Sequence, residues 1–308
     1  MIALMLDVVV IDDAVPGIRT LTLARPDREP LPSFTPGSHL VIEYDGGANA
    51  YSLTGETAAP REYVVSVLEC VDGRGGSRWI HRLSVGDTVA VREPRSAFPP
   101  VLRATRHLLI AAGIGITPMV SHLRSAHRWG REVELLYIHR EGRGAHVDDI
   151  KALTDHARFF TDRVAFSADV AAALANSPFG THAYICGPGQ FIDDVLALAV
   201  DFGWPASRVH VEHFGGELAP GDPFEVELAR SGDTFEVASG VSLLEALEAH
   251  GRTVPSMCRQ GVCGECQVPV RSGVVLHHDL YLSQDERDAG DAMMACVSRG
   301  QGRLELDL

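Results

Sequence analysis

Short runs in which apolar and polar residues alternate fill the first hundred positions of the chain. Turn-forming pairs such as Pro16-Gly17, Pro36-Gly37 and Gly86-Asp87 separate these runs. Alternation with a period of two is typical of strands with one buried face, and frequent turns between short strands favour a small antiparallel barrel. One helix is predicted in this region, at residues 77–83. The predicted strands lie at residues 6–11, 19–23, 40–44, 63–68 and 88–92.

Beyond His107 the pattern changes to apolar strands that alternate with helices. Alternation of this kind predicts a parallel sheet with helices on both faces. The predicted strands lie at residues 108–112, 133–138, 183–186 and 209–214, and the predicted helices at residues 119–129 and 191–202.

A run rich in Gly and Pro then marks the clearest linker of the chain. Two strands follow it, at residues 224–228 and 234–237, and then a helix at residues 243–249 that Ser242 is placed to cap. We therefore expect a multidomain β + α/β + α+β protein. The predicted parts are an antiparallel barrel at residues 1–102, a Rossmann-like parallel domain at 103–216, a linker at 217–223 and an α+β domain at 224–308.

Four of the six cysteines follow the spacing C-x4-C-x2-C with a distant fourth member. This is the plant-type ligand spacing of a [2Fe–2S] cluster. Gly261 and Gly264 allow the loop to fold closely around the iron. A zinc site or disulfides are the alternatives, but zinc usually takes two similar ligand pairs, and a chain start without a basic segment does not indicate secretion. The predicted ligands are Cys258, Cys263, Cys266 and Cys296.

The net charge of −14 is unevenly distributed, because residues 223–308 hold 14 acidic and 7 basic residues. Binding to phosphate backbones needs a basic face, so nucleic acid is excluded as a partner. The acidic excess serves either solubility or docking to a basic protein surface. Cys70 and Cys186 remain as free thiols, which fits a cytoplasmic protein, and no apolar run reaches the length of a membrane span.

A glycine turn with the sequence Gly-Ile-Gly-Ile-Thr-Pro follows the strand at 108–112. This nucleotide turn, residues 113–118, suits close approach of the backbone to a pyrophosphate; a plain strand-to-helix turn is the alternative. Cys186 ends a later strand of the same sheet. Because ligands collect at the carboxyl ends of parallel strands, Cys186 is expected to face the same crevice, unless it is simply a buried small residue.

The order of these parts resembles the phthalate dioxygenase reductase family over essentially the whole chain. Residues 49–53 resemble the R-x-Y-S flavin motif of the family, and residues 73–81 resemble its flavin phosphate loop. Residues 113–118 and 186–188 resemble its pyridine nucleotide motifs. Glu212-His213-Phe214 resembles the E-x-F that ends its nucleotide domain.

The resemblance implies a flavin-binding barrel, with FMN rather than FAD because no segment is identifiable for an adenosine half. Tyr51 would pack on the flavin ring, and Ser52 and Leu53 would offer hydroxyl and backbone groups to it. Asn49 stands where the family has an Arg, and a neutral amide cannot replace that charge. The other residues assigned to the flavin are Gly75, Gly76 and Ser77 around the phosphate, Arg78 as the candidate replacement for the missing Arg, and Phe214.

The resemblance also implies that NADH binds at the nucleotide turn. Glu141 follows the second strand of the sheet, where an acid bonds ribose hydroxyls and disfavours NADPH; the neighbouring Arg140 and Arg143 favour the opposite choice. No side chain is expected to act as a general acid or base. The residues assigned to NADH are Gly113, Gly115, Thr117, Pro118, Glu141, Cys186, Gly187 and Pro188, with Thr117 and Cys186 nearest to hydride transfer.

The family implies that the last domain is a β-grasp ferredoxin and that the protein is a monomer. We expect electrons to pass from NADH to FMN, to the [2Fe–2S] cluster and then to a separate Rieske-type oxygenase that hydroxylates aromatic rings or removes methyl groups. A cytochrome P450 or another monooxygenase is the alternative acceptor. A plain electron carrier without NADH oxidation is the alternative from another functional class.

Overall fold

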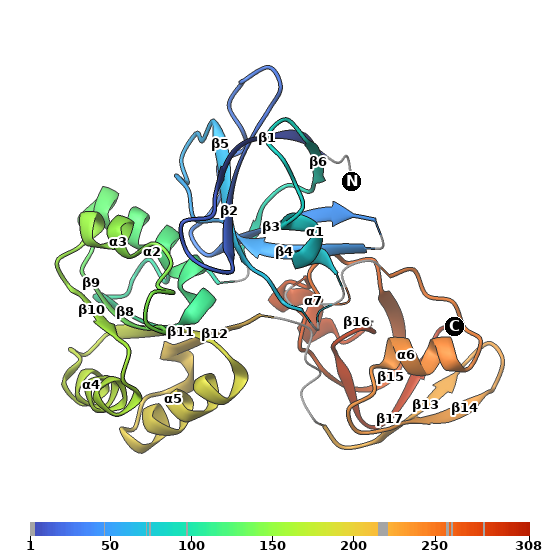
Figure 1. The fold of residues 1–308 in the computed structure, drawn as a ribbon. Coiled ribbons are helices and arrows are strands. Elements are labelled where there is room, and N and C mark those ends of the chain that lie inside the picture. The colour runs from blue at the N-terminus through green and yellow to red at the C-terminus, as the bar shows by residue number, and fades with distance from the viewer. Residues whose placement is uncertain are drawn as a thin grey trace. The chain divides into compact units, whose positions relative to one another are not determined.

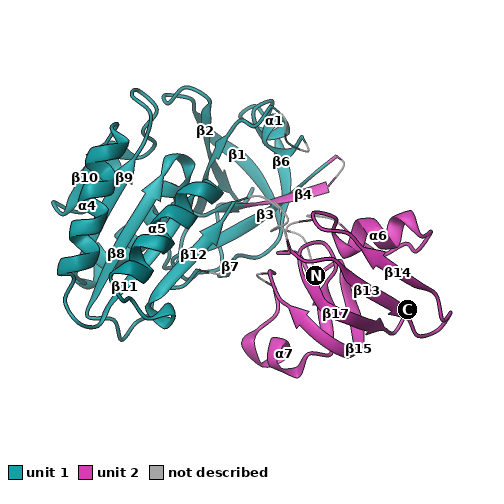
Figure 2. Cartoon of the chain, turned by 90° about the horizontal axis from the view of Figure 1, so that it is seen from below, with its two compact units in different colours: residues 1–44, 51–214 teal, residues 45–50, 215–308 magenta. Residues whose placement is uncertain are grey.

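The computed structural model describes residues 4–45, 47–71, 73, 75–96, 98–214, 221–256, 259, 261–279 and 281–308. The chain forms two compact units (Figure 2). Unit 1 holds residues 1–44 and 51–214, and unit 2 holds residues 45–50 and 215–308. Most of the predicted linker and Cys258 lie outside the described residues. No helix in the described ranges is both long and apolar enough to cross a membrane.

The first sheet is an antiparallel barrel. Its strand order is β4-β3-β6-β1-β2-β5, with β7 paired to β3, and a bridge from Leu53 to Val65 links the residues after β4 to β5. All five predicted strands are present, and α1 ends at Ile80, earlier than predicted, where the chain enters a turn. The elements are β1 (Leu4–Asp12), β2 (Ile18–Ala24), β3 (Ser38–Tyr44), β4 (Gly47–Ser52), β5 (Glu62–Leu68), α1 (Gly76–Ile80), β6 (Thr88–Val91) and β7 (Arg95–Ser96).

The second sheet is parallel throughout, in the order β10-β9-β8-β11-β12. Its strands are β8 (Arg106–Ala112), β9 (Val133–Ile138), β10 (Ala157–Phe160), β11 (Thr181–Gly187) and β12 (Val209–His213). Its helices are α2 (Ile116–Trp129), α3 (Val147–Leu153), α4 (Arg163–Asn176) and α5 (Gly189–Asp201), with short 3-10 turns at Gly113–Gly115 and Ala206–Arg208.

Alternate residues of the central strands face opposite helix layers, as the sequence predicts. Leu109 and Tyr184 lie in one core with residues of α2 and α3. Ile110 and Ile185 lie in a second core with residues of α4 and α5. Figure 1 shows these two helix pairs on opposite sides of the sheet. The carboxyl-terminal ends of β8 and β11 therefore lie between the two helix layers.

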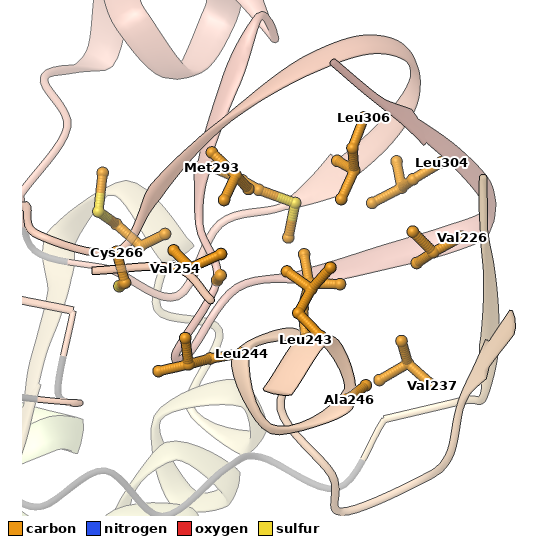
Figure 3. Packing of buried hydrophobic residues seen from close by; sticks show 14 of the residues in the cluster. Val226, Val237, Leu243, Leu244, Ala246, Val254, Cys266, Met293, Leu304 and Leu306 are labelled. Carbon is orange, nitrogen blue, oxygen red and sulfur yellow. The ribbon is translucent and has the colours of Figure 1, made fainter. Parts of the chain in front are cut away.

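Unit 2 contains a mixed sheet in the order β14-β13-β17-β15-β16, in which β13 and β17 are parallel. Leu243, Leu244 and Ala246 of α6 pack with strand residues such as Val226 and Leu304 (Figure 3). The elements are β13 (Phe224–Leu228), β14 (Thr234–Val237), α6 (Leu243–Ala249), β15 (Gln267–Leu276), α7 (Gln284–Ala289), β16 (Ala292–Met294) and β17 (Arg299–Leu306).

One buried cation holds the start of unit 2 in place. Arg299, only 2% exposed, donates hydrogen bonds to the carbonyl groups of Val241 (2.8 Å), Ala238 (3.1 Å) and Asp222 (3.2 Å). Its guanidinium also lies over the ring of Phe224, 5.2 Å from the ring centre. The first residues of the unit are thereby fixed to its last strand.

Candidate functional site

The nucleotide turn and the end of β11 meet at the carboxyl edge of the parallel sheet. A Cβ atom at Gly115 would lie 2.3 Å from the carbonyl oxygen of Cys186, so only glycine fits there. Gly113 has a φ of +56° and open space around its Cα in the described structure. The chain thus brings two loops together around a glycine turn with room for a ligand against its backbone.

Two helices begin at this edge. In the described structure, neither α2 at Gly115 nor α5 at Pro188 receives a hydrogen bond from a side chain at its N-cap. The free amide groups and the helix dipole favour an anion at such ends. Thr117 and Pro118 are buried in the first turn of α2, and Thr117 donates a hydrogen bond to the carbonyl of Ile114 (3.0 Å). These features fit a pyrophosphate.

Cys186 and Glu212 are neighbours across β11 and β12. Both are buried. Burial raises the pKa of Glu212 to about 8, and burial together with the charge of Glu212 raises the pKa of the Cys186 thiol. Oε2 of Glu212 has no hydrogen-bond partner among the described residues, which fits a missing ligand group. The sequence showed Glu212 only as part of a motif; its pairing with Cys186 needs the strand register.

The remaining nucleotide residues are distributed around the same edge. Glu141, with Arg140 and Arg143, is exposed on the loop after β9. A Cβ atom at Gly187 would lie 2.6 Å from the ring of Phe191 in α5, so this position also requires glycine. The predicted nucleotide residues therefore all lie at or just beyond the carboxyl ends of β8, β9 and β11.

The flavin motif occupies the last four residues of β4 and Leu53, which follows the strand. Tyr51 is half-buried against the barrel core, and Ser52 and Leu53 are buried. The amide of Leu53 donates to the carbonyl of Ser38 in β3 (2.9 Å). Asn49 is half-buried in the same strand, and Phe214, after β12, is 40% exposed.

The flavin phosphate loop leads into α1. Gly75 caps this helix with a φ of +105° and open space around it, and the Ser77 hydroxyl accepts a hydrogen bond from the amide of Cys70 (3.0 Å). Arg78 is exposed and donates to the carbonyl of Gly73 (3.4 Å). Arg74 lies outside the described residues. The loop offers glycine backbone, a hydroxyl and a cation, which fits a phosphate.

Three of the four predicted cluster ligands are described and buried: Cys263, Cys266 and Cys296. A hydrogen bond with Cys296 lowers the pKa of Cys266, while the charge of Cys263 opposes this shift. Within the described residues, no three His, Cys, Asp or Glu side chains form a site for a single ion. Each iron of a two-iron cluster takes two ligands, so the close pair Cys266 and Cys296 fits one.

Two glycines set the shape of the cysteine loop, residues 258–266. Gly261 and Gly264 have φ values of +71° and +82°, which strongly favour glycine. A Cβ atom at Gly264 would lie 2.3 Å from the ring of Tyr281, and one at Gly261 would lie 2.9 Å from the Cα of Asp279. The loop is therefore pressed against the segment around Asp279 and Tyr281, which the sequence did not indicate.

Comparison with known protein families gives two matches along the chain. A model described as the N-terminal domain of a dimethylamine monooxygenase subunit DmmA-like protein matches residues 88–209. A model described as a 2Fe-2S iron-sulfur cluster binding domain matches residues 226–300. The second match contains the whole cysteine loop and Cys296.

Two curated relatives align over nearly the whole chain. The heme-dependent oxidative N-demethylase beta subunit of Ectopseudomonas mendocina (strain ymp) is 43% identical over 285 residues, which cover 90% of each chain. The phthalate dioxygenase reductase of Burkholderia cepacia is 36% identical over 308 residues, which cover 94% of this chain and 93% of the relative.

Two solved structures share the fold. Phthalate dioxygenase reductase matches 99% of this chain and 98% of its own, with a TM-score of 0.71 and 34% identity. An intact type IV self-sufficient cytochrome P450 monooxygenase matches 100% of this chain within 41% of its own, with a TM-score of 0.81 and 34% identity. Both matches thus extend over the barrel, the parallel sheet and the mixed sheet of this chain.

Proposed function

The chain belongs to the phthalate dioxygenase reductase family, and we propose that it passes electrons from NADH through FMN and a [2Fe–2S] cluster to a separate oxygenase. As a member, it is an oxidoreductase of the kind that supplies oxygenase systems with electrons. The observation that carries the proposal is the presence, in one chain, of the flavin motif, the nucleotide turn and the cysteine loop. A plain electron carrier would need only the last of these.

In this proposal the nucleotide turn and the start of α5 hold the pyrophosphate of NADH. Gly113 and Gly115 let the backbone approach it, and the amide groups of both helices face its charge. Cys186 and the protonated carboxyl of Glu212 line the nicotinamide end. Glu141 binds the ribose hydroxyls and gives the preference for NADH over NADPH.

The flavin in this proposal is FMN, held on the barrel. Tyr51 packs on its ring, Ser52 and Leu53 bond its polar edge, and Phe214 lies beside it. Its phosphate sits on Gly75, Gly76 and Ser77. Arg78 supplies the charge that Asn49 lacks, since it already reaches back to the same loop at Gly73. FAD is disfavoured because no segment serves an adenosine half.

A flavin held there would supply one chemical property: it can take up a hydride, which carries two electrons and one proton, and give the electrons up one at a time. Cys258, Cys263, Cys266 and Cys296 hold the cluster that receives those single electrons. The other residues of the chain bind and orient these groups. The acidic surface of unit 2 serves as the docking face for the acceptor.

The acceptor is either a Rieske-type or a haem-type oxygenase. A Rieske-type partner follows from the general resemblance to the family. A haem-type, N-demethylating partner is favoured by the heme-dependent relative at 43% identity and by the dimethylamine monooxygenase match. The matching region inside a cytochrome P450 also shows that this reductase architecture occurs together with haem.

Replacing one cluster ligand tests the route. The Cys263→Ser variant should keep NADH-driven reduction of small dyes but lose transfer to cytochrome c and to a purified oxygenase, because only the cluster delivers single electrons to a protein. Cys70→Ser is the matched control and should behave as wild type, because this exposed cysteine contacts Ser77 of the phosphate loop through its backbone amide, which the change keeps. Intact cytochrome c reduction by Cys263→Ser would remove the cluster from the route.

The same assay distinguishes the acceptors. Wild-type protein is mixed with a haem N-demethylase and, separately, with a Rieske oxygenase, and substrate-dependent NADH oxidation is measured. Coupled turnover with only one of them identifies the class of partner.

A further inference from the structure

We propose that Ser121 and Arg124 of α2 are positioning residues that hold the flavin motif in a fixed place relative to the nucleotide turn. This rests on the proposed function, because it concerns hydride transfer from the nucleotide to the flavin. Both residues lie on the same face of α2, three positions apart. Each makes a hydrogen bond to the barrel, and all the groups involved belong to unit 1.

Ser121 joins the nucleotide turn to the barrel through one hydroxyl group. The hydroxyl donates to the carbonyl of Pro118 (2.9 Å) and accepts a hydrogen bond from the amide of Gly37 (2.9 Å). The side chain is fully buried. Pro118 is the last residue of the nucleotide turn, so this oxygen links that turn directly to the loop before β3.

The loop that Ser121 contacts is tightly packed at Gly37. Gly37 has a φ of +75°, and a Cβ atom there would lie 2.0 Å from the carbonyl oxygen of Phe98 and 2.8 Å from Nε2 of His122. His122 itself donates to that carbonyl of Phe98 (2.8 Å). The carbonyl of the next residue, Ser38, accepts the amide of Leu53 (2.9 Å). Ser121 is therefore connected to Leu53 of the flavin motif by two hydrogen bonds and the peptide bond between Gly37 and Ser38.

Arg124 holds the other side of Leu53. Its Nε donates to the carbonyl of Thr54 (2.8 Å). The guanidinium is oriented by Asp149 (3.5 Å), which in turn receives a hydrogen bond from His146 (3.0 Å). Thr54 directly follows the flavin motif, so α2 fixes the chain on both sides of Leu53.

Helix α2 therefore connects the nucleotide turn, proposed to bind NADH, with the flavin motif, proposed to bind FMN. The helix that begins at the nucleotide turn is also the helix that holds the end of the flavin motif. Hydride transfer needs close and well-aligned reactants, and a displacement of about 1 Å costs about a hundredfold in rate. Loosening α2 from the barrel should therefore slow the transfer without removing any group that binds either cofactor.

Two test variants, one control and one conservative replacement test the proposal. Ser121→Ala removes both hydrogen bonds of the hydroxyl. Arg124→Met removes the bond to Thr54 at a side chain that is 25% exposed, so it provides a test even where the buried change impairs folding. Arg128→Met, one turn further along α2, is the control, because Arg124 and Arg128 both pair with Glu56 (3.8 Å each), whereas the bond to Thr54 belongs to Arg124. Arg124→Lys keeps a hydrogen-bond donor at this position and should recover much of the rate that Arg124→Met loses.

The first readout is rapid-mixing reduction of the flavin by NADH. Ser121→Ala and Arg124→Met should each lower the limiting rate constant about tenfold to a hundredfold, with the dissociation constants of NADH and FMN within about threefold of wild type. Arg128→Met should match wild type. Rates in both test variants equal to that of Arg128→Met, or an effect confined to the dissociation constants, would overturn the proposal.

Two further readouts do not depend on turnover. The charge-transfer absorbance between NAD⁺ and the chemically reduced flavin should weaken in both test variants. Hydrogen exchange without nucleotide should accelerate at the Gly37 amide in Ser121→Ala. Unchanged exchange at Gly37 would contradict the proposal. If wild-type flavin is not reduced by NADH at all, the proposed function fails, and the exchange result still decides whether Ser121 holds the barrel.

Discussion

Glu212 carries a carboxyl group that burial keeps protonated near neutral pH. Its partner across the strands, Cys186, is likewise kept as a thiol. A neutral carboxyl can donate a hydrogen bond, whereas a charged one can only accept. At residue scale, therefore, Glu212 and Cys186 form a pair of buried, protonated groups at the place that we propose for the nicotinamide end.

The pKa of Glu212 predicts a specific dependence of stability on pH. The folded pKa of about 8 lies above the ordinary value of 4.5, so the unfolded chain releases the proton first as pH rises. The stabilisation is fully present below pH 4.5 and is lost as pH rises through 8, at about 1.4 kcal/mol per pH unit. Compared with Glu212→Gln, wild type should lose stability across this window.

Tryptophan fluorescence during denaturant unfolding measures this difference. All three tryptophans, Trp79, Trp129 and Trp204, belong to unit 1, so the signal reports the unit that holds Glu212. Because the Gln variant lacks only the titrating group, other titrations cancel in the comparison. Curves of stability against pH that run parallel for the two proteins would show that Glu212 ionises normally.

At the scale of elements, helix ends determine much of the local structure. The Ser242 hydroxyl accepts the amide of Glu245 (3.1 Å), and the Glu245 carboxylate accepts the amide of Ser242 (3.0 Å), which completes a capping box on α6. The sequence predicted this cap. The helix is only seven residues long, so its stability depends on the cap and on the packing of its leucines.

Ser242→Ala should lower the free energy of unfolding of unit 2 by about 1 kcal/mol. The cluster absorbs visible light and is lost on unfolding, so its absorbance during denaturation follows this unit. Ser239→Ala, at an exposed position in the preceding turn, is the control and should change stability by less than about 0.5 kcal/mol. An equal effect of both changes would assign the loss to the turn rather than to the cap.

The sequence predicted best those elements in which apolar and polar residues repeat with the regular period of a strand or a helix. Strands β1, β2, β3, β5 and β6 of the barrel, together with β8, β9 and β11, were predicted close to their observed bounds, whereas β4 and β7 were not predicted. β15 was not predicted, because it contains Pro269 and Gly273, which argue against a long strand. In the structure Pro269 lies opposite Ala292 of β16, and Gly273 lies at one of two register shifts against β17. α4 was not predicted either. It has an exposed Val164 beside buried apolar residues, so its apolar residues do not mark a single helix face.

The same distinction applies to the site. Cysteine spacing and glycine turns are local, so the ligands and the nucleotide turn could be predicted from the sequence. The contact of Gly115 with Cys186, the pairing of Cys186 with Glu212 and the bond from Ser121 to Gly37 join residues that are 71, 26 and 84 positions apart. Such contacts depend on strand register and packing, which no local pattern contains.

At the scale of the whole molecule, negative charge is concentrated in the segment that carries the cluster ligands. Residues 223–308 hold 14 acidic and 7 basic residues. Several acids are neutralised in pairs, such as Glu225 with Arg303 (3.2 Å), but Asp285, Asp288 and Asp291 are exposed in and after α7. Acidic surface of this kind accelerates association with basic partners at low salt.

We therefore expect reduction of basic cytochrome c to slow at least about tenfold as added salt screens the charges. Asp285→Asn with Asp288→Asn should lower the low-salt rate and flatten its salt dependence. Asp193→Asn with Asp194→Asn on α5 is a matched control, because Gln284 bonds Asp288 (2.7 Å) as Gln190 bonds Asp194 (2.9 Å). Stopped-flow rates at saturating NADH measure the effect; equal losses in both pairs would exclude α7 as the docking face.

Arg299 has a consequence for how such proteins are assembled from parts. Arg299, the first residue of β17, binds the carbonyl of Asp222 just before β13, and β13 then pairs with β17. The segment from Asp222 onward is thus closed between its own first and last strands, so we expect it to keep its fold when it is joined to another chain before Asp222. That position is accordingly a suitable junction for joining the segment with the cluster ligands to another flavoprotein.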